Sequence, residues 1–304
     1  MKNDTSLGLT AVVISSLAFG MLPIFTKFAY QGDLVPLDIL TWRFVFGAGA
    51  IWLTWPIWRR WVDLRELTSK QILWRLGLGA VYIFPALIGV LGLERVEATF
   101  YMLLFFTFPA MVALTNRVLG ERMPGMSWVA IGLALTGSAL IIGVNLTVRG
   151  PLDILLPLLN AAGYAVYLVI VGRFFSDAPG LATGALSVSG TLLVLIPLLL
   201  FRGVGIPSSF AGWWPVMGLG VVSTMLALMM MLVAVSLLGA SRAAVMSTLE
   251  LVFSLAFAAL LLGEHIGPTQ LIGGGLIFVS VILLQLPRRE AQPTPVSVAE
   301  PGTD

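Results

Sequence analysis

The hydrophobic residues of the chain form long, nearly continuous runs, and short polar segments separate one run from the next. A helix that crosses about 30 Å of hydrocarbon needs about 20 mostly apolar residues. Runs of that length predict ten membrane-spanning helices, at residues 8–30, 38–58, 72–93, 97–119, 126–145, 152–174, 180–201, 212–238, 242–263 and 268–286. Because the links between the runs are short, consecutive helices should run antiparallel as hairpins. The pattern therefore predicts an all-α polytopic membrane protein.

Composition supports this class. Hydrophobic residues make up 58% of the chain and charged residues only 11%, whereas a soluble domain has about 45–50% apolar and about 25% charged residues. The first run, 8–30, is longer than the roughly 7–15 apolar residues of a secretory signal, so we expect it to remain as the first helix. The segment 287–304 is polar and rich in proline, and we expect it to be a disordered cytoplasmic tail.

The lysines and arginines predict the orientation, because cytoplasmic loops carry an excess of them. With the amino terminus inside, the inner side holds Lys2, Arg59, Arg60, Arg65, Lys70, Arg75, Arg117, Arg122, Arg173, Arg242, Arg288 and Arg289. The outer side then holds only Arg95, Arg149 and Arg202. We therefore expect both termini in the cytoplasm. The short loops and the absence of cysteine favour a multi-pass protein of a prokaryotic inner (plasma) membrane.

A motif that occurs twice divides the chain into halves. Leu119-Gly120-Glu121-Arg122 precedes a helix with Gly132-Leu133, and 143 positions later Leu262-Gly263-Glu264-His265 precedes one with Gly275-Leu276. Each half then holds five spans, and an odd number gives the halves opposite orientations in the membrane. We predict two inverted five-helix repeats, at 1–145 and 146–286. Secondary transporters often have this symmetry, with the substrate site near the midplane.

The repeated motif also indicates a family. Pro109 within the fourth helix, the Gly-Glu motif after it, Lys27, and Asp38 followed by Arg43 resemble the EamA repeat of the drug/metabolite transporter superfamily. Leu249-Glu250 resembles the Leu-Glu-Pro motif of that repeat, and Leu251 stands here in place of its proline. The resemblance extends from about residue 8 to 286.

What the resemblance implies is a ten-helix exporter that moves metabolites out of the cytoplasm by alternating access. Amino acids, amino-acid-like solutes and drugs are the substrate classes of such proteins. Our working hypothesis is an exporter of amino acids, aromatic and hydrophobic ones included, of the YddG type; export of drugs or other metabolites is the alternative.

Tyrosines near mid-span predict the substrate site. Asn160, Tyr164 and Tyr167 share one helical stripe, and Tyr82 lies at a similar depth. An unpaired polar group in lipid costs several kcal/mol, so these side chains should face the bundle interior. They either line a substrate cavity or form hydrogen bonds between helices. Tyr101, one turn into its helix from the outside, is a candidate for closing the mouth.

Three further groups complete the candidate site. Thr224 lies in a span rich in methionine, a residue that suits adaptable binding surfaces as well as gap filling. Glu250 lies deep in a span, where an acid is costly and must be paired or solvated; it could exchange protons, bind a substrate ammonium or serve structure. Lys27 and Arg43 lie in the outer thirds of their spans, near Asp33 and Asp38. They could attract a substrate carboxylate, or they could be snorkelled or paired charges. We expect Glu264 and Glu121 to serve helix ends.

Mid-span prolines are a separate expectation. Pro23, Pro85, Pro109 and Pro157 each remove a backbone hydrogen bond and clash with the preceding turn. They could act as hinges or as fixed kinks.

The sequence excludes several chemistries. With no cysteine and a single histidine, His265, thiol and thiolate-metal chemistry is excluded, and we expect no metal or cofactor. The chain has no phosphate loop and no basic stripe for nucleic acid. An intramembrane enzyme would need paired carboxylates or an activated serine, and a passive channel would need a ring of charges or carbonyls. We expect a monomer whose partners are the small-molecule substrate and the lipid bilayer.

Overall fold

The computed structural model describes residues 2–32, 34–60, 62–120, 125–144, 148–175, 180–238 and 246–285, and every regular element in these ranges is a helix. Seven helical stretches are long and apolar enough to cross a membrane: Thr5–Tyr30, Ser69–Arg95, Ala98–Val118, Gly125–Ile142, Pro151–Phe174, Gly180–Arg202 and Phe210–Ala234. Leu249–Leu262 and Pro268–Leu284 are shorter apolar helices. The all-α membrane class is confirmed, while the count of ten spans stays a prediction.

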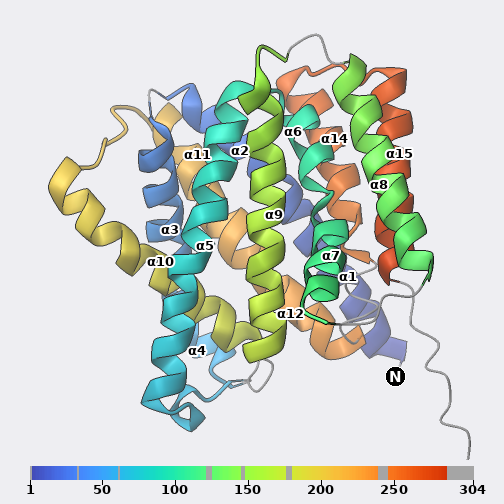
Figure 1. The fold of residues 1–304 in the computed structure, drawn as a ribbon. Helices are drawn as coiled ribbons and strands as arrows, with labels where there is room; N and C mark the ends of the chain where they lie inside the picture. Colours follow the sequence, from blue (N-terminus) through green and yellow to red (C-terminus); the bar gives the residue numbers. More distant parts are fainter. Residues whose placement is uncertain are drawn as a thin grey trace, which may run out of the picture.

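The helices follow the predicted hydrophobic runs along the chain (Figure 1). The first half holds α1 (Lys2–Gly20), α2 (Leu22–Tyr30), α3 (Pro36–Leu53), α4 (Trp55–Trp58), η1 (Leu64–Glu66), α5 (Ser69–Arg95), α6 (Ala98–Phe105), α7 (Phe108–Val118) and α8 (Gly125–Val144). The second half holds α9 (Pro151–Phe174), α10 (Gly180–Arg202), α11 (Phe210–Gly220), η2 (Val221–Leu226), α12 (Ala227–Leu238), α14 (Leu249–Leu262) and α15 (Pro268–Gln285). The predicted tail 287–304, like Asp33 and Glu121, lies outside the described residues.

Local sequence signals explain where several helices begin and end. Pro36 and Pro151 occupy the first turns of α3 and α9, where the missing N–H costs nothing. Thr68 opens α5 with a capping box: its backbone N–H donates to Gln71 Oε1 at 2.9 Å, and the Gln71 N–H donates to Thr68 Oγ1 at 3.3 Å. Gly263 ends α14 in the left-handed conformation, with φ of 68°, which glycine adopts without strain.

Breaks within the predicted spans fall near some prolines and not others. The span around Pro109 is divided into α6 and α7, and the span around Pro23 into α1 and α2. Pro85 and Pro157 instead lie inside the continuous helices α5 and α9. A proline within a span is therefore not sufficient by itself to interrupt a helix here.

The element η2 is a segment of π-helix within the span that runs from α11 to α12. Such segments are rare and occur often at functional sites. Its hydroxyls engage helix α1: Ser223 Oγ donates to the Ala18 carbonyl at 2.7 Å, and the Ser15 Oγ of α1 donates to the Ala227 carbonyl at 2.8 Å. These two contacts show that α1 and the η2–α12 segment run antiparallel.

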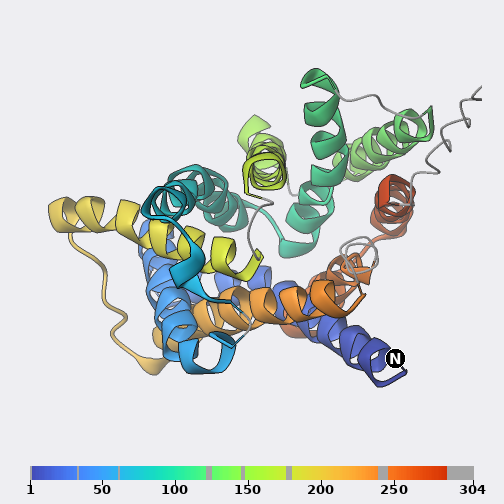
Figure 2. The same cartoon turned by 90° about the horizontal axis from the view of Figure 1, so that it is seen from below.

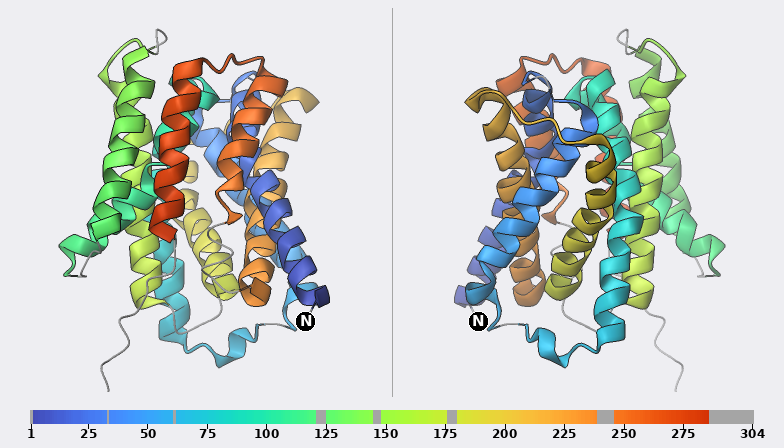
Figure 3. Two further views of the ribbon diagram at one scale, coloured as in Figure 1. Left: turned by 90° about the vertical axis from the view of Figure 1, so that its right-hand side faces the viewer. Right: turned by 90° about the vertical axis from the view of Figure 1, so that its left-hand side faces the viewer.

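Helices from the two halves pack against each other throughout the bundle. α1 packs along α12, α5 along both α9 and α10, and α11 along α3. α8 and α15 lie side by side at one edge (Figures 1 and 2). There a Cβ on Gly137 would lie 2.5 Å from the Gly273 carbonyl oxygen, so these glycines allow the close approach typical of membrane helices. Helix α1 begins and α15 ends at the same side of the bundle (Figure 3).

Candidate functional site

A continuous series of aromatic rings links five helices of the bundle, and we call it the aromatic chain. Its members come from α3, α5, α6, α7 and α9 and are Phe44, Tyr82, Tyr167, Tyr164, Phe105 and Phe108. The Tyr82 and Tyr167 ring centroids are 4.9 Å apart, and those of Tyr164 and Phe108 are 5.2 Å apart. The structure thus brings three of the sequence-predicted tyrosines into one cluster.

Other polar groups of the predicted site have hydrogen-bond partners within the protein. The Tyr167 hydroxyl donates to Ser187 Oγ at 3.2 Å. Asn160 Nδ2 donates to the Tyr101 hydroxyl, and Tyr101 is only 2% exposed. Its ring lies against Gly92, where a Cβ would come within 2.6 Å of it. These contacts favour interhelical packing of Tyr101 over the mouth-closing role expected from the sequence.

Arg43 is a buried cation whose position depends on the π-helix. It is 5% exposed, its Nε donates to Thr224 Oγ1 at 3.2 Å, and its guanidinium carbon lies 5.4 Å from the Phe44 ring centroid. The Thr224 hydroxyl itself donates to the Leu219 carbonyl, five residues earlier, at 2.9 Å. Among the described residues the two Nη groups of Arg43 have no hydrogen-bond partner.

The nearby acid Asp38 does not pair with Arg43 in the structure. Asp38 instead accepts from Arg202 Nη1 at 3.3 Å, because Asp38 in the first turn of α3 faces the end of α10. Arg43, one to two turns deeper, makes no ion pair within the described part of the chain. The positive charge of Arg43 is therefore available to a bound molecule.

Glu250 lies in the first turn of α14 and is partly buried. Its carboxylate makes no hydrogen bond or ion pair with any described residue. Tyr164 lies close enough to both groups for the charges of Glu250 and Arg43 to act on its hydroxyl. One tyrosine of the aromatic chain thus feels the charges of both a buried cation and an acid, which come from different halves of the sequence.

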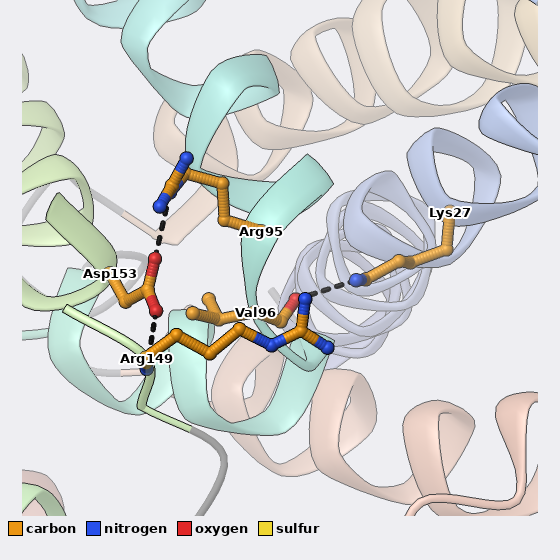
Figure 4. Close-up of polar contacts among 5 residues, drawn as sticks. All are labelled: Lys27, Arg95, Val96, Arg149 and Asp153. Carbon is orange, nitrogen blue, oxygen red and sulfur yellow. Dashed lines mark hydrogen bonds and ion pairs between the residues drawn. The ribbon is translucent and has the colours of Figure 1, made fainter.

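The corner between α5 and α6 is held by side chains from α2 and α9 (Figure 4). Lys27 Nζ of α2 donates to the Val96 carbonyl at 2.5 Å, at the end of α5 where a positive charge is favoured by the helix dipole. Asp153 of α9 accepts from Arg95 Nε at 2.7 Å and from the Arg149 backbone N–H at 2.8 Å. Lys27 therefore has a structural partner here and does not lie in the aromatic chain.

Glu264, from the second copy of the Gly-Glu motif, caps the helix on the other side of this corner. Its two carboxylate oxygens accept from the Ala98 and Thr99 backbone N–H groups, each at 2.7 Å. Glu97 lies beside it, and burial together with the Glu264 charge raises the pKa of Glu97. Glu264 thus serves a helix end, as expected, although the helix is α6 of the first half and not its own.

These features define a polytopic helical membrane protein with a cluster of polar and aromatic side chains between its helices. The profile of the EamA-like transporter family matches residues 6–143 and again 152–286. The chain therefore belongs to the EamA-like transporter family of the drug/metabolite transporter superfamily, which confirms the resemblance seen in the repeated motif.

Similar proteins agree with that assignment. A Bacillus subtilis protein named uncharacterized transporter YcbK is 26% identical over 294 residues, which cover 91% of this chain and 92% of that protein. An Archaeoglobus fulgidus protein named uncharacterized transporter is 24% identical over 277 residues, covering 91% of this chain and 95% of its own. One crystal structure aligns with a TM-score of 0.60 at 19% identity, over 93% of this chain and 97% of that one; this likeness supports the fold alone.

Proposed function

We propose that the chain is a secondary transporter that exports small zwitterionic metabolites, chiefly amino acids with aromatic or hydrophobic side chains. The observation that carries this proposal is that Arg43 and Glu250 both act electrostatically on Tyr164, and that neither has an ion-pair partner among the described residues. An α-amino acid carries one carboxylate and one ammonium, and it would satisfy both charges at once.

The chemistry of each group fits one part of such a substrate. Arginine binds carboxylates through paired N–H donors, and the Nη groups of Arg43 are those left without a partner. A carboxylate in a membrane interior is costly unless a cation neutralises it, so Glu250 would bind the ammonium. The rings of the aromatic chain would contact an apolar or aromatic side chain by stacking and edge contacts.

The transport cycle we propose is alternating access between two inverted repeats, 1–145 and 146–286, in a cell inner membrane with both termini in the cytoplasm. The double match of the family profile supports two units. The packing supports their symmetry: α5 lies along α9, and its counterpart α12 lies along α1. The division of the fourth span into α6 and α7, beside the aromatic chain, provides a discontinuous helix of the kind that transporters use near the midplane.

Other functions fit the site less well. A cationic drug would satisfy Glu250 and leave Arg43 unpaired, which is costly for a buried charge. A passive channel has no need of a site with opposite charges from two halves. We therefore propose transport in preference to catalysis or passive conduction.

The test is counterflow with the purified full chain in liposomes. Liposomes loaded with unlabelled phenylalanine, leucine or alanine should accumulate the same labelled amino acid transiently and with saturation. Tetraphenylphosphonium, a lipophilic cation without a carboxylate, is the matched probe for a drug exporter. Linear, non-saturable flux would indicate a channel, and accumulation of the cation alone would contradict the zwitterion proposal.

A further inference from the structure

Helices α1 and α14 approach each other closely at one glycine. A Cβ on Gly20 would lie 3.1 Å from Phe253 Cβ and 3.2 Å from the Ser254 nitrogen. Across the same contact Ser254 Oγ donates to the Gly20 carbonyl at 3.3 Å. Further along both segments, Lys27 and Glu264 bond to neighbouring positions of one corner, the Val96 carbonyl and the Ala98 N–H. The two segments therefore run in the same direction, and residues at equal offsets from this contact lie at the same level.

One helical turn before the contact, this register places Ser16 opposite Glu250. Each is four positions before its partner in the contact, Gly20 and Ser254, and residues four apart share a helix face. Ser16 is 0% exposed, and its Oγ has no hydrogen-bond partner in the part of the chain that the structure describes. Glu250 has none among the described residues either. Two polar groups without partners thus occupy one level of the α1–α14 interface.

The missing hydrogen bond of Ser16 is informative, because a serine or threonine hydroxyl in a helix can usually donate to the carbonyl of the preceding turn. Thr26 and Thr41, for example, donate to the carbonyl four residues earlier at 2.8 and 2.7 Å. Ser16 does not do so. A buried hydroxyl without a partner is costly where no water is available, which indicates that it binds a group absent from its own helix.

We propose that Ser16 is a positioning residue for Glu250: its hydroxyl donates to the ionised carboxylate through a side-chain rotation and so sets the pH at which Glu250 binds a proton. A hydroxyl suits this role because it donates to a carboxylate and accepts from a protonated carboxyl. The consequence is that a proton and a substrate ammonium compete for the same acid, so that export of the substrate is coupled to uptake of a proton. This role in transport rests on the proposed function, whereas the pairing of Ser16 with Glu250 does not.

Other titratable groups on the elements around Glu250 are engaged or distant from this level. On α2, Lys27 and Tyr30 donate to the carbonyls of Val96 and Val90. On α6, Tyr101 accepts from Asn160. On α9, Tyr164 faces Glu250 from the side of the aromatic chain. The stretch of α1 from Thr5 to Gly20 holds no charged residue. Ser16 is thus the hydroxyl that α1 presents to this acid.

The test measures protonation of Glu250 without any substrate. Dicyclohexylcarbodiimide reacts with protonated carboxyl groups in apolar surroundings. The full chain in liposomes is labelled from about pH 5 to about pH 9, a range wide enough for a buried carboxyl, and mass spectrometry follows the peptide that contains Glu250. Glu250→Gln gives the blank. Ser15→Ala is the matched control, because the neighbouring Ser15 hydroxyl is already bound to the Ala227 carbonyl.

We expect Ser16→Ala to shift the labelling midpoint toward higher pH by roughly 0.5–1 unit, because hydrogen bonding to the charged carboxylate favours that form. Ser16→Thr should restore the wild-type midpoint, and Ser15→Ala should leave it unchanged. Ser16→Gly removes the same hydroxyl and provides the measurement if Ser16→Ala fails to fold. Equal midpoints in wild type and Ser16→Ala, an equal shift in Ser15→Ala, or no pH-dependent labelling of Glu250 would each overturn the proposal. Loss of counterflow with an intact midpoint shift would count against the proposed function alone.

Discussion

At the scale of single residues, the central question is whether Arg43 is a substrate ligand. Replacing it with glutamine keeps one donor for Thr224 but removes the charge and the paired N–H groups. A hydrogen bond to a charged group contributes about 1.5–3 kcal/mol, so we expect the half-saturation concentration for phenylalanine in counterflow to rise by roughly 10- to 100-fold. Arg43→Lys should recover little, because lysine cannot bind a carboxylate in the paired geometry.

Arg202 is the matched control for this measurement. Its guanidinium pairs with Asp38 at 3.3 Å, and its side chain is 44% exposed. Its partner Asp38 is only 7% exposed, so removing Arg202 leaves that carboxylate without its cation and lowers stability. Arg202 lies away from the aromatic chain. Arg202→Gln should leave the half-saturation concentration within about twofold of wild type. An equal loss in both variants would remove Arg43 from the substrate site.

Two neighbouring glutamates at the α5–α6 corner should respond to substitution in opposite directions. The Glu264 carboxylate caps α6 through the Ala98 and Thr99 N–H groups, and loss of a cap costs about 0.5–2 kcal/mol. Glu264→Ala should therefore lower the melting temperature of the purified chain. Unchanged melting in this variant would show that the cap contributes nothing to stability.

Glu97 is the second of these two glutamates, and its substitution should stabilise the chain. Burial and the charge of Glu264 raise the pKa of Glu97. A raised pKa in the folded state means that the folded chain binds the proton more tightly than the unfolded chain. Glu97 therefore favours folding at acidic pH, and this contribution is lost as the pH rises through the folded-state pKa. Glu97→Gln should raise the melting temperature at pH about 7 and change it little at pH about 4. A lower melting temperature at neutral pH would contradict this sign.

At the scale of elements, the close pairing of α8 with α15 depends on glycine. A Cβ on Gly137 would lie 2.5 Å from a backbone oxygen of Gly273, whereas a Cβ on Gly132 of the same helix would meet nothing within 4 Å. Gly137→Ala should destabilise the chain by about 1–3 kcal/mol through overpacking. Gly132→Ala should be neutral or stabilising, because alanine favours the helix by up to about 1 kcal/mol. Unfolding in a denaturant series measures both, and equal effects would argue against a tight α8–α15 contact.

The elements also show what the sequence could predict. The positions of the helices could be predicted from the hydrophobic runs, because a helix must have about 20 apolar residues to cross the hydrocarbon layer. Pro109 indicated the break between α6 and α7. No residue in Val221–Leu226 indicated the π-helix at η2. The wider turns of this segment place Thr224 beside Arg43.

At the scale of the whole molecule, the partners of charged residues could not be predicted, because they come from distant elements. Glu264 reads as a helix-end residue, but nothing local indicates that it caps α6, more than 160 positions earlier. Asp38 lies nearer to Arg43 in the sequence than to Arg202, yet it pairs with Arg202. Ser16 looked like an ordinary small residue in an apolar helix. Its missing hydrogen bond became visible only once α1 and α14 were placed together.

The orientation of the whole molecule in the membrane is the last prediction. The lysine and arginine distribution places the segment around Arg65 inside and the segment around Val148 outside. The chain contains no cysteine, so single cysteines can be introduced at 65 and 148 and labelled in intact cells with an impermeant maleimide. We expect labelling at 148 and none at 65 until the cells are permeabilised, which controls for reactivity.

A third cysteine at 265 should label like 148, because the inverted repeat places the second Gly-Glu motif on the outer side. Labelling at 65 and not at 148 would reverse the orientation, and labelling of 265 together with 65 would contradict the inverted repeat itself.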